Sequence, residues 1–272
     1  MTNEKNVFLL IVEGGSDKTA LEGPINFYLR LKKLYGVLTC AVYHTDISTH
    51  AFGDFDNLMS DSYNVEENIK KCVKAFIDSP IDNPNKYELK NIVAVASLTD
   101  LDCCYCKDED VVFKPFADGD LKKTYPDYAN KKLVCNDVTF IRKRNALKVA
   151  SLGILSTQDI IVIDGYKINY KAFYMSVNLE HALYNDKRQL TDFDKNNLAQ
   201  EFRSNASNED NSIFELLQTI PIISHNYHDS WDEKELMKHP FDRFSNIIIL
   251  IDWLVSICES KMAKEDKENA NW

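Results

Sequence analysis

Residues 7–17 read VFLLIVEGGSD, in which six apolar residues lead directly into a glutamate, two glycines, a serine and an aspartate. A continuous apolar run with β-branched ends is typical of a central parallel strand that is covered on both faces. The two glycines permit a sharp turn, and Ser16 or Asp17 is a suitable N-cap for a following helix. We therefore predict a strand, a tight turn and a helix, with Glu13 at the carboxyl end of the strand.

Strands and helices continue to alternate over the next eighty residues. The first helix is expected to break or restart at Gly23-Pro24. Further helices are expected at 25–34 and 65–76, strands at 37–43 and 92–98, and a polar loop at 44–63. This alternation predicts an α/β fold with a parallel sheet flanked by helices. Ligands bind such sheets at the carboxyl ends of the strands, where Glu13, Asp100 and Asp102 stand.

The second half of the chain is less regular. It contains a strand candidate at 160–163 and a segment at 171–184 that is strand-like at first and helical from about Asn178. Helices are expected at 193–202, 213–219 and 243–264. The predicted organisation is an α/β domain over 1–170, a mainly helical C-terminal region over 171–264, and a charged, frayed or disordered tail over 265–272.

The overall charge bears on nucleic-acid binding. The 272 residues carry a formal net charge of −10, whereas a phosphate-binding surface needs clustered Lys and Arg. A nucleic-acid function would therefore need a local basic patch, a metal or a partner. Arg142, Lys143 and Arg144, with Lys148, form the densest basic cluster and are the candidates for gripping phosphates; the alternative is a solvated charged surface.

Cysteine usage and hydropathy bear on the cellular environment. Seven cysteines without an N-terminal signal sequence point to a reducing cytoplasm. Cys103, Cys104 and Cys106 adjoin the acidic residues, but a zinc site needs a matching second pair and only Cys135 is near, so buried or half-buried free thiols are predicted. The longest apolar run, 247–255, is far shorter than the roughly 20 residues that span a bilayer, so no membrane segment is expected.

The carboxylates at the strand ends suggest a metal site. Asp100 and Asp102 point to the same side if their segment stays extended, because side chains in a strand alternate with period two. Converging carboxylates repel one another unless a hard cation such as Mg²⁺ neutralises them, and such a cation suits phosphoryl transfer. Taken alone, the motif can also be a polar strand end or a helix cap.

Both motifs together resemble a known domain. The sequence EGGSD at 13–17 after one apolar strand, with DLD at 100–102 after another, resembles the Toprim domain of topoisomerases, bacterial primases and overcoming-lysogenization-defect nucleases. The resemblance implies a Toprim-like sheet, with Glu13 as the catalytic glutamate, either a metal ligand or a general acid/base. It implies that Asp17, Asp100 and Asp102 are metal ligands. The separation of Glu13 and Asp100, 100 − 13 = 87 residues, is longer than in compact Toprim domains.

A second similarity concerns residues 176–183, SVNLEHAL. In stand-alone Toprim nucleases of bacterial defence systems, a further glutamate opens a helix after the last strand. By this resemblance Glu180 is an additional metal ligand, and His181 contacts phosphate or shuttles a proton. The alternative is that Asn178 caps an ordinary surface helix.

The resemblance leads to a functional expectation. We expect a cytoplasmic, Mg²⁺- or Mn²⁺-dependent endonuclease that hydrolyses DNA or RNA, tRNA included, with Glu13, Asp100 and Asp102 as catalytic residues. The family context implies an effector of antiphage defence or abortive infection. The chain has no Walker motif, so nucleotide control would come from a partner ATPase or sensor; a homo-oligomer is left open. Two alternatives remain: another Toprim role, in RNA maturation or primase- or topoisomerase-like work, or a non-enzymatic binding or inhibitory module.

Overall fold

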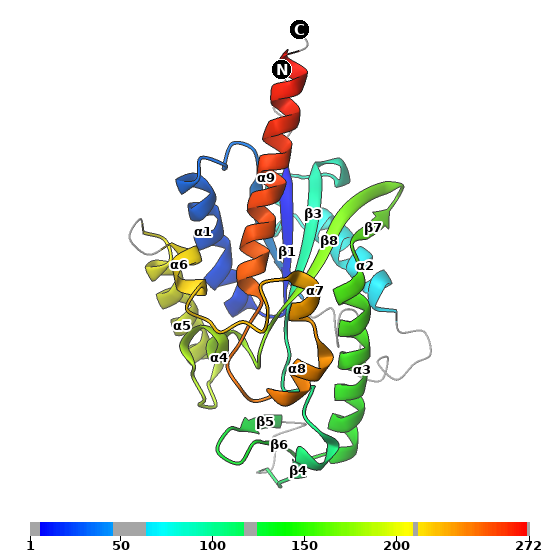
Figure 1. Cartoon of the computed structure of the whole chain (residues 1–272), viewed down its shortest axis with the longest axis vertical. Coiled ribbons are helices and arrows are strands. Elements are labelled where there is room, and N and C mark those ends of the chain that lie inside the picture. Colours follow the sequence, from blue (N-terminus) through cyan, green and yellow to red (C-terminus); the bar gives the residue numbers. More distant parts are fainter. Residues whose placement is uncertain (1–5, 46–63, 117–123, 209–211, 271–272) are drawn as a thin grey trace.

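The computed structural model describes residues 6–45, 64–116, 124–208 and 212–270, with 264–270 described by their backbone alone. A five-stranded sheet in the order β2-β1-β3-β8-β7 forms its centre (Figure 1). The strands are β1 (Val7–Val12), β2 (Thr39–His44), β3 (Ile92–Asp100), β7 (Ile160–Ile163) and β8 (Tyr166–Met175). β2, β1, β3 and β8 run parallel, and only β7 is antiparallel to its neighbour. The predicted α/β class with a mostly parallel sheet is confirmed.

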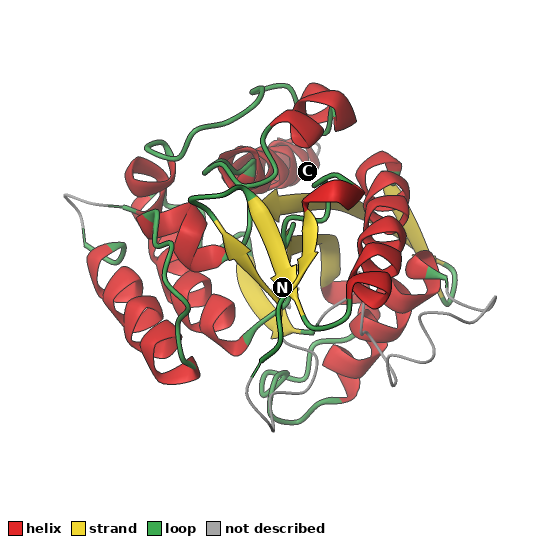
Figure 2. Ribbon diagram, turned by 90° about the horizontal axis from the view of Figure 1, so that it is seen from below, coloured by secondary structure: helices red, strands yellow, loops and turns green. Residues whose placement is uncertain are grey.

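β1 occupies the middle of the sheet because both of its faces are apolar. All six of its residues are buried. Phe8, Leu10 and Val12 belong to one hydrophobic core and Val7 and Leu9 to another, as the period-two alternation of a strand requires. The first core includes side chains of α1 (Gly15–Leu31) and α9 (Ile247–Ala270), and the second includes those of α2 (Val65–Asp78) and α3 (Val138–Thr157). Figure 2 shows helices on both sides of the sheet.

Helix α1 is continuous, so the break predicted at Gly23-Pro24 is wrong. Leu21 and Ile25, on either side of the proline, are buried in the same core. This packing outweighs the cost of a proline inside a helix, which is about 3 kcal/mol. Gly23 allows a close approach of Arg203, because a Cβ atom at position 23 would lie 3.1 Å from the Arg203 Nε atom.

The C-terminal region is helical, as expected. Its elements are α4 (Leu179–Tyr184), α5 (Asp192–Asn205), α6 (Ile213–Leu217), α7 (Tyr227–Ser230), α8 (Glu233–Lys238) and α9. Helix α9 continues to Ala270 and projects beyond the sheet (Figure 1). The frayed tail expected from residue 265 is therefore helical through Ala270; lysine, glutamate and alanine, which recur there, are good helix formers.

A small second sheet lies beyond the lower end of the central sheet in Figure 1. It consists of β4 (Val111–Phe113), β5 (Thr124–Asp127) and β6 (Lys132–Cys135) in the order β4-β6-β5. The short 3-10 helices η2 (Leu89–Asn91) and η3 (Asp108–Asp110) precede β3 and β4. The segment between Asp102 and α3 therefore contributes a small sheet that was not predicted from the sequence.

Other expectations can be compared directly with the structure. The predicted loop 44–63 falls mainly outside the described residues. All seven cysteines are buried free thiols, as predicted for the cluster near the acids. No helix within the described ranges combines the length and hydropathy required to cross a membrane.

Candidate active site

The carboxyl ends of β1 and β3 bring the first two acids together. The strands are parallel neighbours with Val12 opposite Leu98, so Glu13, directly after β1, lies beside the end of β3. The Thr99 hydroxyl donates a hydrogen bond to Glu13 Oε1. Asp100 is the last residue of β3. Both acids therefore occupy the edge of the sheet that the sequence predicted for them.

Asp17 is returned to this edge by the first turn of α1. Its side chain is buried, and its Oδ2 accepts a hydrogen bond from the Gly14 N–H at 2.9 Å. Burial raises the pKa of Asp17 to about 7, and the charge of Glu180 raises the pKa in the same direction. The Gly14 hydrogen bond and the positive charge of Lys195 oppose this shift. Asp17 thus both caps the turn and lies within electrostatic reach of a second acid.

Asp100 is surrounded by negative charge. Burial raises its pKa well above the ordinary value of 3.8, and the charges of Asp17, Glu13 and Asp102 raise it further, against the opposing charge of Lys148. Its Oδ1 atom is buried and accepts no hydrogen bond from any residue that the structure describes. The four acids of the two sequence motifs therefore form one electrostatically coupled group.

Asp102 does not follow the extended path that the alternation argument assumed. Its φ is 49° and that of Cys103 is 57°, both left-handed values. Such a value costs less for an aspartate than for most other residues. The backbone stays attached to the segment after β8, because the Asp102 N–H donates to the Val177 carbonyl at 3.1 Å. The extended path that the period-two argument requires is therefore absent at Asp102, and the Asp102 carboxylate contacts a lysine while its charge still acts on Asp100.

That lysine is Lys148 of α3, which is fully buried. Its Nζ atom lies 2.7 Å from Asp102 Oδ2 and 3.4 Å from Glu13 Oε1. The sequence had assigned Lys148 to a nucleic-acid-binding cluster; instead its ammonium group is a counter-ion inside the acidic group. The helical spacing gave one indication that Lys148 is buried, because it falls on the same face of α3 as the buried residues Ile141, Asn145 and Leu152.

The other members of the basic cluster differ in their contacts and exposure. Arg142 donates to the Asp108 carbonyl with its Nε at 2.9 Å. Arg144 donates to the Asn145 side chain at 2.8 Å and to the Asp102 carbonyl at 3.3 Å. Only Lys143 of the four is classed as exposed. The structure does not gather these four side chains on one phosphate-binding surface.

Glu180 and His181 both lie inside the protein. Asn178 caps α4 by accepting from the His181 N–H at 2.9 Å, as one sequence alternative proposed, but both side chains are buried and the helix is not a surface helix there. The Glu180 charge acts on Asp17. Glu180 therefore joins the acidic group.

The His181 ring is held in a mainly apolar setting. Its Nδ1 atom lies 3.2 Å from the Ser176 hydroxyl, and its ring centroid lies 4.7 Å from that of Tyr128. Burial lowers the pKa of His181 to about 4, and the charges of Lys187 and Arg243 act in the same direction. The imidazole is accordingly neutral near pH 7, so it cannot offer phosphate a positive charge.

The donor chemistry of the acidic group suits a hard divalent cation, since its ligands are all carboxylate oxygens and Asp100 Oδ1 is buried without a hydrogen bond among the described residues. However, no three His, Cys, Asp or Glu side chains in the described ranges are arranged to hold a metal ion. The Lys148 ammonium group contacts both Glu13 and Asp102, and the Gly14 N–H donates a hydrogen bond to Asp17. Metal binding would require the Lys148 side chain and the Asp17 carboxylate to move.

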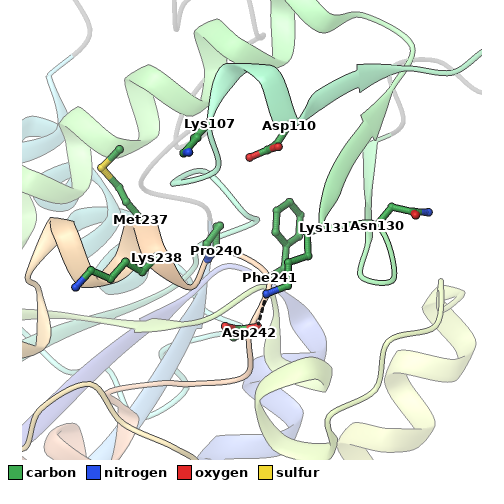
Figure 3. Close-up of a pocket in the computed structure, with 9 residues that line it drawn as sticks. All are labelled: Lys107, Asp110, Asn130, Lys131, Met237, Lys238, Pro240, Phe241 and Asp242. Carbon is green, nitrogen blue, oxygen red and sulfur yellow. Dashed lines mark ion pairs between the residues drawn. The ribbon is translucent and has the colours of Figure 1, made fainter.

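None of the five acids lines the cavity near the small sheet. That cavity, about 280 Å³, lies between the small sheet and α8 (Figure 3) and is lined by Lys107, Asp110, Asn130, Lys131, Met237, Lys238, Pro240, Phe241 and Asp242. Its charges are paired in part, since the Lys131 Nζ lies 3.7 Å from Asp242 Oδ1. Glu13 lines a separate hollow of about 10 Å³.

Comparisons with known proteins found no match: no protein-family model, no curated protein and no solved structure matches this chain. The resemblance to the Toprim domain therefore rests on the motifs at 13–17 and 100–102 and stays a prediction.

Proposed function

We propose that this protein is a divalent-metal-dependent nuclease of the Toprim type that hydrolyses phosphodiester bonds in nucleic acid. One observation carries the proposal. Five acids from β1, α1, the end of β3 and α4 form one coupled group at the carboxyl edge of a parallel sheet, with Asp17 and Asp100 shifted toward the protonated state by burial and mutual repulsion. A protein retains such a repulsive group at a stability cost, which is typical of functional sites.

The residues have distinct roles in this proposal. Asp17, Asp100 and Asp102 would hold the cation, with Glu180 beside them, while Glu13 serves as the proton acceptor. A bound Mg²⁺ or Mn²⁺ stabilises negative charge on the phosphate. Glu13 accepts a proton as the oxygen of a water molecule bonds to phosphorus and the ester P–O bond breaks, and the departing oxygen takes up a proton from solvent.

Two neighbours position Glu13 for this step. The Thr99 hydroxyl donates to Glu13 Oε1, and the buried Lys148 ammonium lies 3.4 Å from the same oxygen. Both contacts restrict the orientation of the Glu13 carboxylate. Lys148 is therefore a positioning residue, because it acts through Glu13 and Asp102.

The test has two independent readouts. Purified protein is incubated with DNA, RNA and tRNA in the presence of Mg²⁺ or Mn²⁺, and Mn²⁺ binding is measured separately by electron paramagnetic resonance. We expect metal-dependent cleavage that falls by about 100-fold or more in Glu13→Gln, as loss of a general base requires. We also expect Mn²⁺ binding to weaken in Asp100→Asn.

Glu109→Gln is the matched control, since Glu109 is an exposed acid outside the group. It should change neither readout. Cleavage that persists unchanged in Glu13→Gln would place the active site elsewhere. Absence of cleavage on all three substrates, together with absence of Mn²⁺ binding, would refute the proposal.

A non-enzymatic binding or inhibitory module is the second candidate. It is favoured by the ion pairs of Lys148, which already neutralise part of the acidic charge, and by the absence of a preformed metal geometry in the described residues. Substrate binding without cleavage in the same assay would support it. The antiphage role and control by a partner ATPase remain predictions from the resemblance.

A further inference from the structure

The β7 edge of the central sheet combines exposed apolar side chains with an open strand. β7 is terminal in the sheet order, and β8 is its one strand neighbour among the described residues. Ile160 and Val162 are 47% and 49% exposed, and nearby Tyr166 and Ile154 are 46% exposed each. Edge strands of this kind are usually blunted by charge or proline because they template pairing with another chain.

The backbone groups of β7 that face outward can be assigned from its pairing with β8. The Tyr170 N–H donates to the Asp159 carbonyl at 2.8 Å, so Asp159 directs its backbone toward β8. Alternate residues do the same, and Ile160 and Val162 direct theirs away from the sheet. The Gln158 side chain donates to the Ile160 carbonyl at 2.5 Å, which agrees with an outward orientation.

The outward backbone groups of β7 are complementary to the same groups of a second β7 strand. In an antiparallel pair of β7 strands with Ile161 on the two-fold axis, Ile160 lies opposite Val162 of the second copy. Both residues direct backbone groups outward, so each N–H meets a carbonyl, and their exposed side chains meet on one face. Gln158 and Asp164 lie outside β7 and take no part in this pairing, and the Gln158 side chain must release the Ile160 carbonyl when the second strand binds.

Other registers are less favourable. If the partner strand is shifted by one residue, Ile160, whose backbone groups point outward, lies opposite Ile163, whose backbone groups point toward β8. The N–H and carbonyl groups of the two strands then do not face each other. Placing Val162 on the axis restores the phase, but Ile160 then lies opposite position 164, where the chain has already left β7 and turned toward β8. Placing Ile160 on the axis is also in phase, but Val162 then lies opposite Gln158, which precedes β7. Among these registers, only pairing about Ile161 sets the two outward residues of β7 opposite each other.

We propose that a second copy of this chain docks on β7, with β7 paired antiparallel to β7 about a two-fold axis at Ile161, so that the central sheet continues across two molecules. The two-fold axis reverses the direction of β8 in the second copy, so the acidic groups of the two copies face opposite edges of the joined sheet. The contact is small, and association is expected in the roughly micromolar range. This inference does not depend on the proposed nuclease activity.

Disulfide trapping tests the register. H-bonded antiparallel partners have Cα atoms about 5.5 Å apart, within disulfide range, whereas diagonal neighbours are roughly 7–8 Å apart. Ile160→Cys and Val162→Cys are therefore each expected to stay uncrosslinked alone and to form a covalent dimer when mixed and oxidised. The native cysteines are buried, which keeps the background low.

Sedimentation velocity over a concentration series tests the surface itself. Val162→Lys should weaken association about tenfold or more, because the lysine sets a charge against the apolar side chain of the other copy. Phe193→Lys, at a 73% exposed site in α5, is the matched control and should behave as wild type. A wild-type protein that stays monomeric, or a dimer that Val162→Lys leaves intact and the cysteine mixture fails to trap, would overturn the proposal.

Discussion

Replacing Lys148 by methionine removes the buried ammonium group while keeping a side chain of similar length. The group is fully buried and contacts Asp102 at 2.7 Å and Glu13 at 3.4 Å, whose side chains are 39% and 15% exposed. Removing one partner of a fully buried ion pair costs about 3–5 kcal/mol, whereas exposed pairs contribute at most about 1 kcal/mol. Because the acids are partly hydrated, we expect a loss of about 2–3 kcal/mol in the free energy of unfolding.

The assay is urea unfolding at pH 7, followed by circular dichroism, with the free energy extrapolated to water. Lys143→Met, on the same helix but exposed, is the control and should change stability by less than about 0.5 kcal/mol. Asp102→Asn combined with Lys148→Met should cost less than the sum of the two single changes, since both remove the same ion pair.

Divalent cations provide a second prediction from the same variant. Without the ammonium group the acidic group is more negative, so millimolar Mn²⁺ should stabilise Lys148→Met more than wild type, by mass action on the folded state. If Lys148→Met is as stable as Lys143→Met, the Lys148 ammonium group does not stabilise the folded protein through Glu13 and Asp102. If Mn²⁺ stabilises both proteins equally, the ammonium group does not compete with a cation.

Three further predictions concern stability outside the site. Asn83→Ala should cost about 2–3 kcal/mol in urea unfolding, because the buried N–H and carbonyl of Tyr87 lose their hydrogen bonds to the Asn83 side chain; an unchanged midpoint would contradict this. Gly23→Ala should stabilise α1 by about 0.5–1 kcal/mol, provided that the flexible arginine beside it shifts, and a lower melting temperature would show that it cannot. Burial acts to raise the pKa of Asp82, but the hydrogen bond from Lys18 and one from a serine hydroxyl prevail and lower it below 3.8. The ionised Asp82 carboxylate therefore stabilises the folded state above about pH 4, and this stabilisation is lost as the pH falls through the lowered pKa. Asp82→Asn should accordingly lose less stability than wild type on acidification. Equal losses in the two proteins would refute the assignment.

The fold was predictable where local pattern and burial agree. Residues 7–12 are apolar on both faces, and such a strand can only be satisfied at the centre of a sheet. The helix at 65–76 was predictable from its apolar spacing, and the strand at 92–98 from its apolar run. The break at Gly23-Pro24 was predicted wrongly because a local propensity of a few kcal/mol cannot outweigh a core that buries both halves of α1.

The candidate site shows where the sequence stops being sufficient. The sequence by itself determined that Glu13 and Asp100 stand at the ends of two strands. The two residues come together because those strands are parallel neighbours in the sheet. Only the tertiary structure decided that Lys148, 46 residues beyond Asp102, lies between the acids, and that Asp102 turns away from an extended path. The physical reason is that charge compensation acts through space at a few ångströms, whereas sequence patterns report burial along a single element.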